Sequence, residues 1–190
     1  MRNLSVILSV LVGGWLVSGA ARADDTNLPR THLGLFEAQT GRVIIKGTAD
    51  IGLLSVNAGV VSVQCREARD AAGGSQVLGV IVGLKAGNHP EDNAILDYDE
   101  LDSVLQGVDY ISKANYSVTS LPGFDAVYIT RDALRIAAHS SNKSPGTIVF
   151  FLQSGSGGQT RLSLTPSQFA QFLSLIQQAR TRLDSLYKRG

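Results

Sequence analysis

Six carboxylates lie close together near the middle of the chain, and they form its densest group of side chains capable of chemistry. They are Glu91, Asp92, Asp97, Asp99, Glu100 and Asp102. Carboxylate oxygens are the ligands that Ca²⁺ prefers in proteins. This stretch is therefore the part of the sequence that most looks like a functional site.

The spacing from Leu96 to Glu100 resembles the end of an EF-hand calcium loop, where an apolar residue precedes a bidentate Glu. Counting back, the first loop position is His89 instead of Asp, and the sixth is Ala94 instead of Gly. A simpler alternative is helix capping, because Asp97 with Glu100 three residues later forms a capping-box pattern. The sequence favours capping and predicts no metal ion or other cofactor.

The histidines and serines form no recognisable catalytic motif. The histidines His32, His89 and His139 are scattered and lack the spacing of metal ligands on one helix. Ser154 in the Ser-Gly-Ser-Gly-Gly segment stands where the nucleophile elbow of esterases needs a Gly. We therefore assign no catalytic, cofactor-binding or metal-binding residue from the sequence.

A second group of polar residues lies on predicted strands in the C-terminal half. Arg135 and His139 share one face of a predicted strand, and Tyr128 lies on the strand before it. If that face forms a groove, these three side chains can receive an anionic ligand. The alternative is an ordinary solvent-facing strand with polar outward positions, which the sequence favours.

Cys65 is the one cysteine of the chain, so no internal disulfide can form. It follows Val61 and Val63 in an alternating pattern that predicts one buried strand face. We expect Cys65 to be a buried structural thiol, because no histidine lies near it in the sequence to activate it.

The N-terminal residues 1–23 have the anatomy of a secretory signal peptide. Arg2 provides the positive start, an apolar run extends from Leu4 to Val17, and Ala21-Arg22-Ala23 is a small-x-small cleavage signal. We expect cleavage after Ala23 and a secreted or periplasmic mature protein of residues 24–190. The apolar run is too short for a stable membrane span, which favours a cleaved signal peptide over a membrane anchor. No second apolar stretch of that kind follows, so we expect no stable membrane insertion after cleavage.

Cleavage also changes the charge of the chain. Loss of Arg2 and Arg22 moves the net charge from +1 to −1. A near-neutral chain without a basic block has no electrostatic footprint for nucleic acid, and we expect no nucleic-acid partner. The basic residues near the C-terminus complement the negative end of a predicted helix.

The remaining pattern predicts one α+β domain, an antiparallel sheet of roughly seven to nine strands with two amphipathic helices packed on it. The first helix follows Asp97 and ends near Asn115, and the second has Thr165 as N-cap and Pro166 at its first position. The predicted strands are Thr31–Ala38, Arg42–Gly47, Leu53–Val56, Val60–Glu67, Val77–Lys85, Ala126–Thr130, Leu134–His139, Thr147–Gln153 and Thr160–Leu164.

The two halves of the chain match each other at an offset of 68 residues. Val80-Ile81-Val82 matches Ile148-Val149-Phe150, and the match continues without a gap into both helices. One explanation is a duplicated strand–strand–helix unit. The other is coincidence, because strands and amphipathic helices share apolar patterns.

Two classes of function remain open from the sequence. The first is a non-catalytic binding or protein-interaction module of the cell envelope, with a protein or small-ligand partner. The second is a small secreted enzyme, such as a hydrolase, whose site forms only in three dimensions from His139, Tyr128, Arg135 and the acidic cluster. A pocket that holds a histidine and an acid together would favour the enzyme, and a flat apolar patch the module.

Overall fold

The computed structural model describes residues 29–140, 146–154 and 160–188. The predicted signal peptide (residues 1–23) and the predicted turn at residues 155–158 lie outside the described residues. The helices are α1 (His32–Glu37), the short 3-10 helix η1 (Tyr98–Glu100), α2 (Leu101–Ser112) and α3 (Pro166–Tyr187). The strands are β1 (Ile44–Val56), β2 (Gly59–Asp70), β3 (Gln76–Ala86), β4 (Asp92–Asp97), β5 (Phe124–Ile129), β6 (Arg135–Ser140), β7 (Ile148–Gln153) and β8 (Arg161–Leu164).

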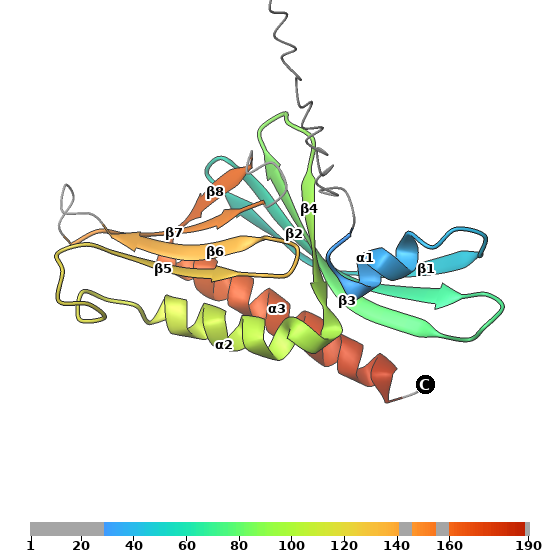
Figure 1. The fold of residues 1–190 in the computed structure, drawn as a ribbon. Helices are drawn as coiled ribbons and strands as arrows, with labels where there is room; N and C mark the ends of the chain where they lie inside the picture. Colours follow the sequence, from blue (N-terminus) through green and yellow to red (C-terminus); the bar gives the residue numbers. More distant parts are fainter. Residues whose placement is uncertain (1–28, 141–145, 155–159, 189–190) are drawn as a thin grey trace, which may run out of the picture.

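The strands form two antiparallel sheets, each with four strands that follow one another in sequence order (Figure 1). The first sheet contains β1 to β4 and is followed by α2, and the second contains β5 to β8 and is followed by α3. The first sheet has the longer strands. Its strands β1 and β2 pair along their full length, from Ile44 with Asp70 to Val56 with Gly59. The protein is thus an α+β protein.

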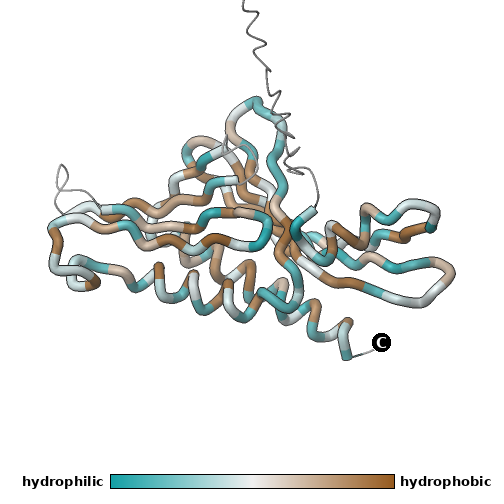
Figure 2. Tube along the Cα trace, viewed as in Figure 1, coloured by the Kyte–Doolittle hydropathy of each residue, from teal (hydrophilic) through white to brown (hydrophobic). Residues whose placement is uncertain are grey.

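A hydrophobic core joins both sheets to the two long helices. α2 and α3 pack against each other; α2 also contacts β5 and β6, and α3 contacts strands of both sheets. Val63 of β2, Ile136 of β6 and Phe172 of α3 are fully buried in this shared core. Figure 2 shows hydrophobic residues recurring along these strands and helices. Each large buried side chain contributes about 1.5–3 kcal/mol before its entropy is subtracted.

Both long helices begin where their N-terminal signals place them. The side chain of Asp97 and that of Glu100 form a reciprocal capping box at the start of η1, as the sequence predicts. Thr165 caps α3 and pairs in the same way with Gln168, and Pro166 occupies the first turn. These caps satisfy backbone N–H groups that have no partner inside the helix.

The predicted strand Thr31–Ala38 is wrong, because His32–Glu37 forms helix α1. The Thr31 hydroxyl accepts a hydrogen bond from the backbone N–H of Gly34 at 3.1 Å and caps the helix. Leu33 and Phe36 then lie on one side of α1 and pack on the outer face of the first sheet in a small second core. Alternation in the sequence conceals this helical spacing.

The prediction of one sheet is also wrong, since the strands divide into two. The predicted strands Arg42–Gly47 and Leu53–Val56 are parts of one strand, β1, whose pairing shifts between Asp50 and Gly52. The sequence does not predict β4 (Asp92–Asp97). Its residues lie in the acidic stretch, which we interpret from the sequence as the cap of the following helix.

The predicted gap-free register between the halves does not carry over to the strand pairing. Val82 pairs with Ala94 in the first sheet, and the matching residue Phe150 pairs with Leu164 instead of Leu162 in the second. The difference is two residues, so every side chain keeps its face of the sheet.

Candidate functional site

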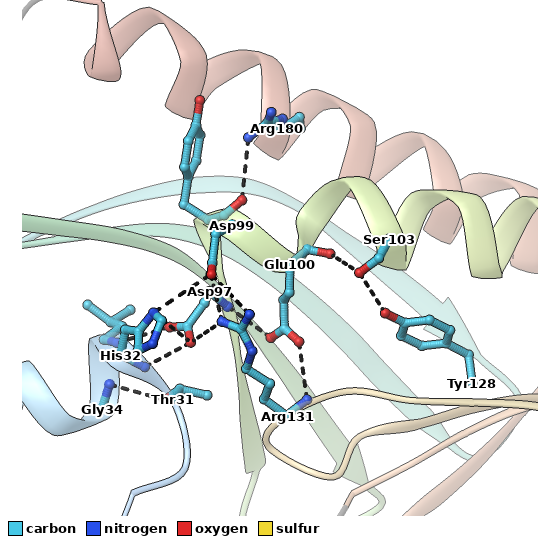
Figure 3. A network of polar contacts seen from close by, with 12 residues as sticks. Thr31, His32, Gly34, Asp97, Asp99, Glu100, Ser103, Tyr128, Arg131 and Arg180 are labelled. Carbon is cyan, nitrogen blue, oxygen red and sulfur yellow. Dashed lines mark hydrogen bonds and ion pairs between the residues drawn. The ribbon is translucent and has the colours of Figure 1, made fainter.

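The carboxylate of Asp97 connects α1 to the end of β4 (Figure 3). It accepts hydrogen bonds from the backbone N–H groups of His32 at 2.8 Å and Leu33 at 3.0 Å. The Asp97 side chain is only 2% exposed, so these bonds form away from water. A buried carboxylate needs such donors, and the first N–H groups of α1 have no partner inside their helix.

Arg131 brings a cation to this carboxylate from the turn between β5 and β6. Its Nη1 lies 3.1 Å from Asp97 and 2.6 Å from Asp99, and its Nη2 lies 2.9 Å from the second oxygen of Asp99. The hydrogen bonds from Arg131 hold the pKa of Asp99 below its usual range, and those from Asp99 and Asp97 raise the pKa of Arg131. The forked contact fixes the direction of the Asp99 carboxylate.

The turn that carries Arg131 is tightly formed. The Thr130 N–H donates to the carbonyl of Leu134 at 3.0 Å, and the Leu134 N–H donates to the Thr130 hydroxyl at 3.1 Å. Ala133 adopts a φ of 61°, a conformation that is uncommon for residues other than Gly. The backbone thus accepts local strain at the turn that delivers Arg131.

Two further carboxylates seal the free edge of β4. Glu100 accepts the backbone N–H groups of Asp97 at 3.0 Å and Arg131 at 3.1 Å, and Asp132 accepts the N–H of Ile95 at 2.8 Å. Burial raises the pKa of both Glu100 and Asp132. The outward N–H groups of Ile95 and Asp97 are therefore unavailable to another strand.

A pocket of about 430 Å³ opens beside this network. Its walls are His32, Gln76, Val77, Leu78, Asp97, Tyr98, Asp99 and Tyr187. The rings of Tyr98 and Tyr187 stack with centroids 5.1 Å apart, and the guanidinium carbon of Arg180 lies 4.3 Å from the Tyr98 centroid. The Tyr98 hydroxyl donates to Asp184 at 2.7 Å, and burial raises its pKa. The pocket thus combines aromatic and apolar walls with two carboxylates.

His32, Asp97 and Asp99 are close enough for metal binding in principle. One ligand atom from each lies within 4.8 Å of the others, and the His32 Nδ1 is 3.9 Å from Asp97 and 3.8 Å from Asp99. The guanidinium of Arg131, however, already contacts both carboxylates. The arrangement favours an internal ion pair over a bound metal ion.

The structure disperses the acidic stretch that the sequence presents as one cluster. Glu91 accepts from the Ser62 hydroxyl at 2.7 Å, Asp92 from the Ser154 hydroxyl at 2.9 Å, and Asp102 from Arg180 at 3.1 Å. Strand β4 passes through the segment in which an EF-hand would have its loop. Asp97, Asp99 and Glu100 remain together.

The anionic-ligand group of Arg135, His139 and Tyr128 does not form. Tyr128 lies on the face of the second sheet that packs on α2, where its hydroxyl is 2.9 Å from that of Ser103. His139 lies on the opposite face, and its Nδ1 is 2.7 Å from Asp125. Paired residues share a face of the sheet, and Tyr128 pairs with Ile136, three positions before His139 on β6. Because successive residues of a strand point to alternate faces, Tyr128 and His139 lie on opposite faces.

Cys65 occupies the buried position that its alternating pattern predicts. It is 3% exposed, and its Sγ lies 3.5 Å from the carbonyl of Ala179. Burial raises the pKa of the thiol to about 11. The thiolate that a nucleophile needs is therefore scarce at neutral pH.

Sequence reasoning missed His32, Arg131 and Tyr187 as neighbours of the acidic stretch. Their separations along the chain are too long for any spacing rule to connect them. The sequence indicates one wall of the pocket through the capping pair Asp97 and Glu100, because Asp97 lines the pocket. The others follow only from the path of the chain between the two sheets.

Comparisons of the chain with protein-family models, with curated proteins and with solved structures return no match. The fold and the pocket define the protein as an α+β protein of two four-stranded antiparallel sheets with an acidic, tyrosine-lined pocket. Among the described residues, none of the helices has the length and apolar character that crossing a membrane requires.

Proposed function

We propose that the protein is exported and acts as a non-catalytic binding module of the cell envelope, with the pocket beside His32 as its ligand site. The observation that carries this proposal is the composition of the pocket. Val77, Leu78 and the Tyr98–Tyr187 stack supply apolar and aromatic walls, and a few polar groups converge on one side. Such walls with few polar groups are typical of small-molecule sites.

The charge of the pocket favours a ligand with a cationic group and an apolar or aromatic body. Asp97 and Asp99 line it, and Arg131 contacts both carboxylates without lining the pocket, so the three side chains together carry one net negative charge. Asp99 is 52% exposed, and a carboxylate keeps free lone pairs after it accepts a forked guanidinium. Tyr187 is 64% exposed, so its ring can receive a cation.

Matched small probes test this proposal. We expect tyramine at millimolar concentration to raise the melting temperature of the mature protein by a few degrees, because it binds the native state. The matched probe 4-ethylphenol, which lacks the amine, should give a smaller shift. The variants Asp99→Asn and Tyr187→Ala should lose the response to tyramine, and isothermal titration gives the affinities.

The control variant is Asp109→Asn, because the Asp109 side chain on α2 is 49% exposed and its one ion pair among the described residues is with Lys113. It should respond to tyramine as the wild type does. Equal responses to tyramine and 4-ethylphenol would contradict the cationic class, and no response to any amine in a wider panel would contradict the pocket as a ligand site.

Export is tested separately, by the mass of the chain recovered from the envelope or the medium. We expect a chain that begins at Asp24. Its near-ultraviolet absorbance should come from tyrosine alone, because Trp15 is the one tryptophan and lies in the predicted signal peptide. A tryptophan signature would contradict cleavage after Ala23.

A hydrolase remains the second candidate, because one pocket holds His32 together with Asp97 and Asp99. Two features weigh against it. The His32 Nδ1 is beyond hydrogen-bond distance of both carboxylates, and the described lining offers neither a Ser, Thr nor Cys nucleophile. Hydrolysis of p-nitrophenyl acetate that His32→Ala abolishes would support the enzyme; tyramine binding without such hydrolysis would support the module.

The duplicated strand–strand–helix unit is also a proposal. The order of the elements supports it, because β3, β4 and α2 correspond to β7, β8 and α3 at the predicted offset. The two-residue difference in pairing register requires a shift within one hairpin after duplication. Duplication would explain why both helices lie side by side.

A further inference from the structure

Exposed hydrophobic side chains concentrate between the end of α2 and the end of β5. Six of the eleven large exposed hydrophobic residues in the described part of the chain lie there: Tyr110, Tyr116, Val118, Leu121, Val127 and Ile129. Val127 and Ile129 are 40% and 56% exposed on the outer face of β5. Exposed apolar residues that cluster on a strand indicate a contact surface.

β5 is also an edge strand with free backbone groups. The N–H of Thr130 bonds to the carbonyl of Leu134, and bonded pairs alternate along an antiparallel ladder. The backbone N–H and C=O groups of Asp125, Val127 and Ile129 therefore point away from β6. No described residue is hydrogen-bonded to these outward groups.

The other strand edges are protected. Asp132 and Glu100 bind the outward N–H groups of β4. β1 carries Lys46 and a register shift after Asp50, and β8 contacts β1 and β3 of the first sheet. Charged side chains, bulges and covering elements are the usual means of keeping edges from pairing. Within the described residues, β5 carries one charged side chain, Asp125, and pairs with β6 without a register shift, so its edge is the least interrupted.

We propose that β5 pairs with β5 of a second copy of this chain, antiparallel and centred on Val127, to form a two-fold dimer with a continuous eight-stranded sheet. Antiparallel pairing about Val127 sets Asp125 of each copy opposite Ile129 of the other. Ile129 pairs with Arg135 within its own sheet, so Arg135 stands in the same row as the other copy's Asp125.

Charge complementarity selects a second copy as the occupant. Strands are about 4.8 Å apart, so the Asp125 and Arg135 side chains can meet across one intervening strand. The symmetry produces this pair twice, which makes the surface self-complementary as a two-fold interface requires. Arg135 is exposed and has no carboxylate partner among the described residues.

Sedimentation or light scattering of the mature protein over a concentration series tests the proposal. The wild type should form dimers. Val127→Pro removes an N–H that points outward, so the β5–β6 ladder should survive while the dissociation constant rises at least about tenfold. Val127→Thr, which keeps the N–H and the β-branched shape, is the matched control, and circular dichroism verifies that all variants fold.

Charge reversal tests the register. Asp125→Arg alone and Arg135→Asp alone should each weaken the dimer by placing like charges together. An equimolar mixture of these two variants should restore association, because a mixed pair regains both opposite-charge contacts. A wild type that stays monomeric, a dimer that Val127→Pro leaves intact, or a mixture that fails to associate would overturn the proposal. A protein that stays monomeric and pairs its β5 with a strand of another protein would also contradict the proposed dimer.

Discussion

At the scale of single residues, Glu100 determines much about the pocket although it does not line it. Its buried carboxylate holds the backbone N–H groups of Asp97 and Arg131, and thereby fixes the two residues that form the central ion pair. The Asp99 carboxylate, in contrast, is half exposed and held by a cation. Two acids one position apart in the sequence therefore have opposite electrostatic environments.

This difference predicts the pH dependence of stability. Burial raises the pKa of Glu100 above its ordinary value of 4.5, so the native state keeps a proton that the unfolded state has released. We expect the free energy of unfolding to fall as pH rises from about 4.5 to that raised pKa, with a slope of up to about 1.4 kcal/mol per pH unit. Asp99, with its lowered pKa, acts in the other direction and at lower pH, where acid removes its contribution.

Urea unfolding at a series of pH values checks the assignment. Glu100→Gln should reduce the slope just above pH 4.5 and leave only what Asp132, whose pKa burial also raises, contributes. It should also cost some stability, because a side-chain amide has one acceptor oxygen for two N–H donors. Asp109→Asn should leave the slope unchanged. If Glu100→Gln retains the full wild-type slope, the titrating group is another residue.

At the scale of elements, Gly107 allows a test of the close packing of α2 on β5. A Cβ atom on Gly107 of α2 would lie 2.3 Å from the Cδ2 atom of the Tyr128 ring. Alanine normally stabilises a helix by about 1 kcal/mol relative to glycine. Here we expect Gly107→Ala to destabilise the protein by about 1–3 kcal/mol, because the ring must move.

A double-mutant cycle separates the two effects. In a Tyr128→Ala background the space beside Gly107 opens, so Gly107→Ala should become neutral or stabilising, as helix propensity alone predicts. Chemical denaturation of the four proteins gives the coupling energy. The same destabilisation in both backgrounds would show that the glycine serves some purpose other than close packing.

The elements also show which parts of this fold a sequence can reveal. α2 and α3 could be predicted because each has a capping box and a repeated apolar stripe, with Asp97 and Thr165 marking the starts. α1 could not, because six residues provide less than two helical turns and depend on Asp97 from β4 for their N-terminal hydrogen bonds. Local pattern identifies elements that are stable locally, and α1 depends on a distant partner.

The pocket was beyond prediction for the same reason. Asp97 is recognisable as a cap, but His32, Arg131 and Tyr187 reach it only through the packing of α1, the β5–β6 turn and α3. The division into two sheets is likewise a long-range property. The same alternating strands are compatible with one sheet or two, because their periodicity fixes only which face is buried.

At the scale of the whole molecule, the shared core predicts that the two sheets unfold together. Val63 of the first sheet and Ile136 of the second are buried in one cluster with Phe172 of α3. We expect one cooperative urea transition, with far-ultraviolet and near-ultraviolet circular dichroism coinciding. Ile136→Ala should lower the free energy of unfolding by about 2–5 kcal/mol, and both circular dichroism signals should report the same decrease. Separate transitions for the two signals would contradict a common core.

The sealed edge of β4 has a consequence for the number of partners that the molecule can accept. Each open strand edge can pair with one other chain, so a molecule with a single open edge can form only a dimer. A second open edge would allow each copy to join two others and extend into a filament. The side chains of Asp132 and Glu100 accept the outward N–H groups of Ile95 and Asp97, so the edge of β4 is not open to another strand. In the proposed dimer, these two carboxylates therefore keep the assembly closed at two copies.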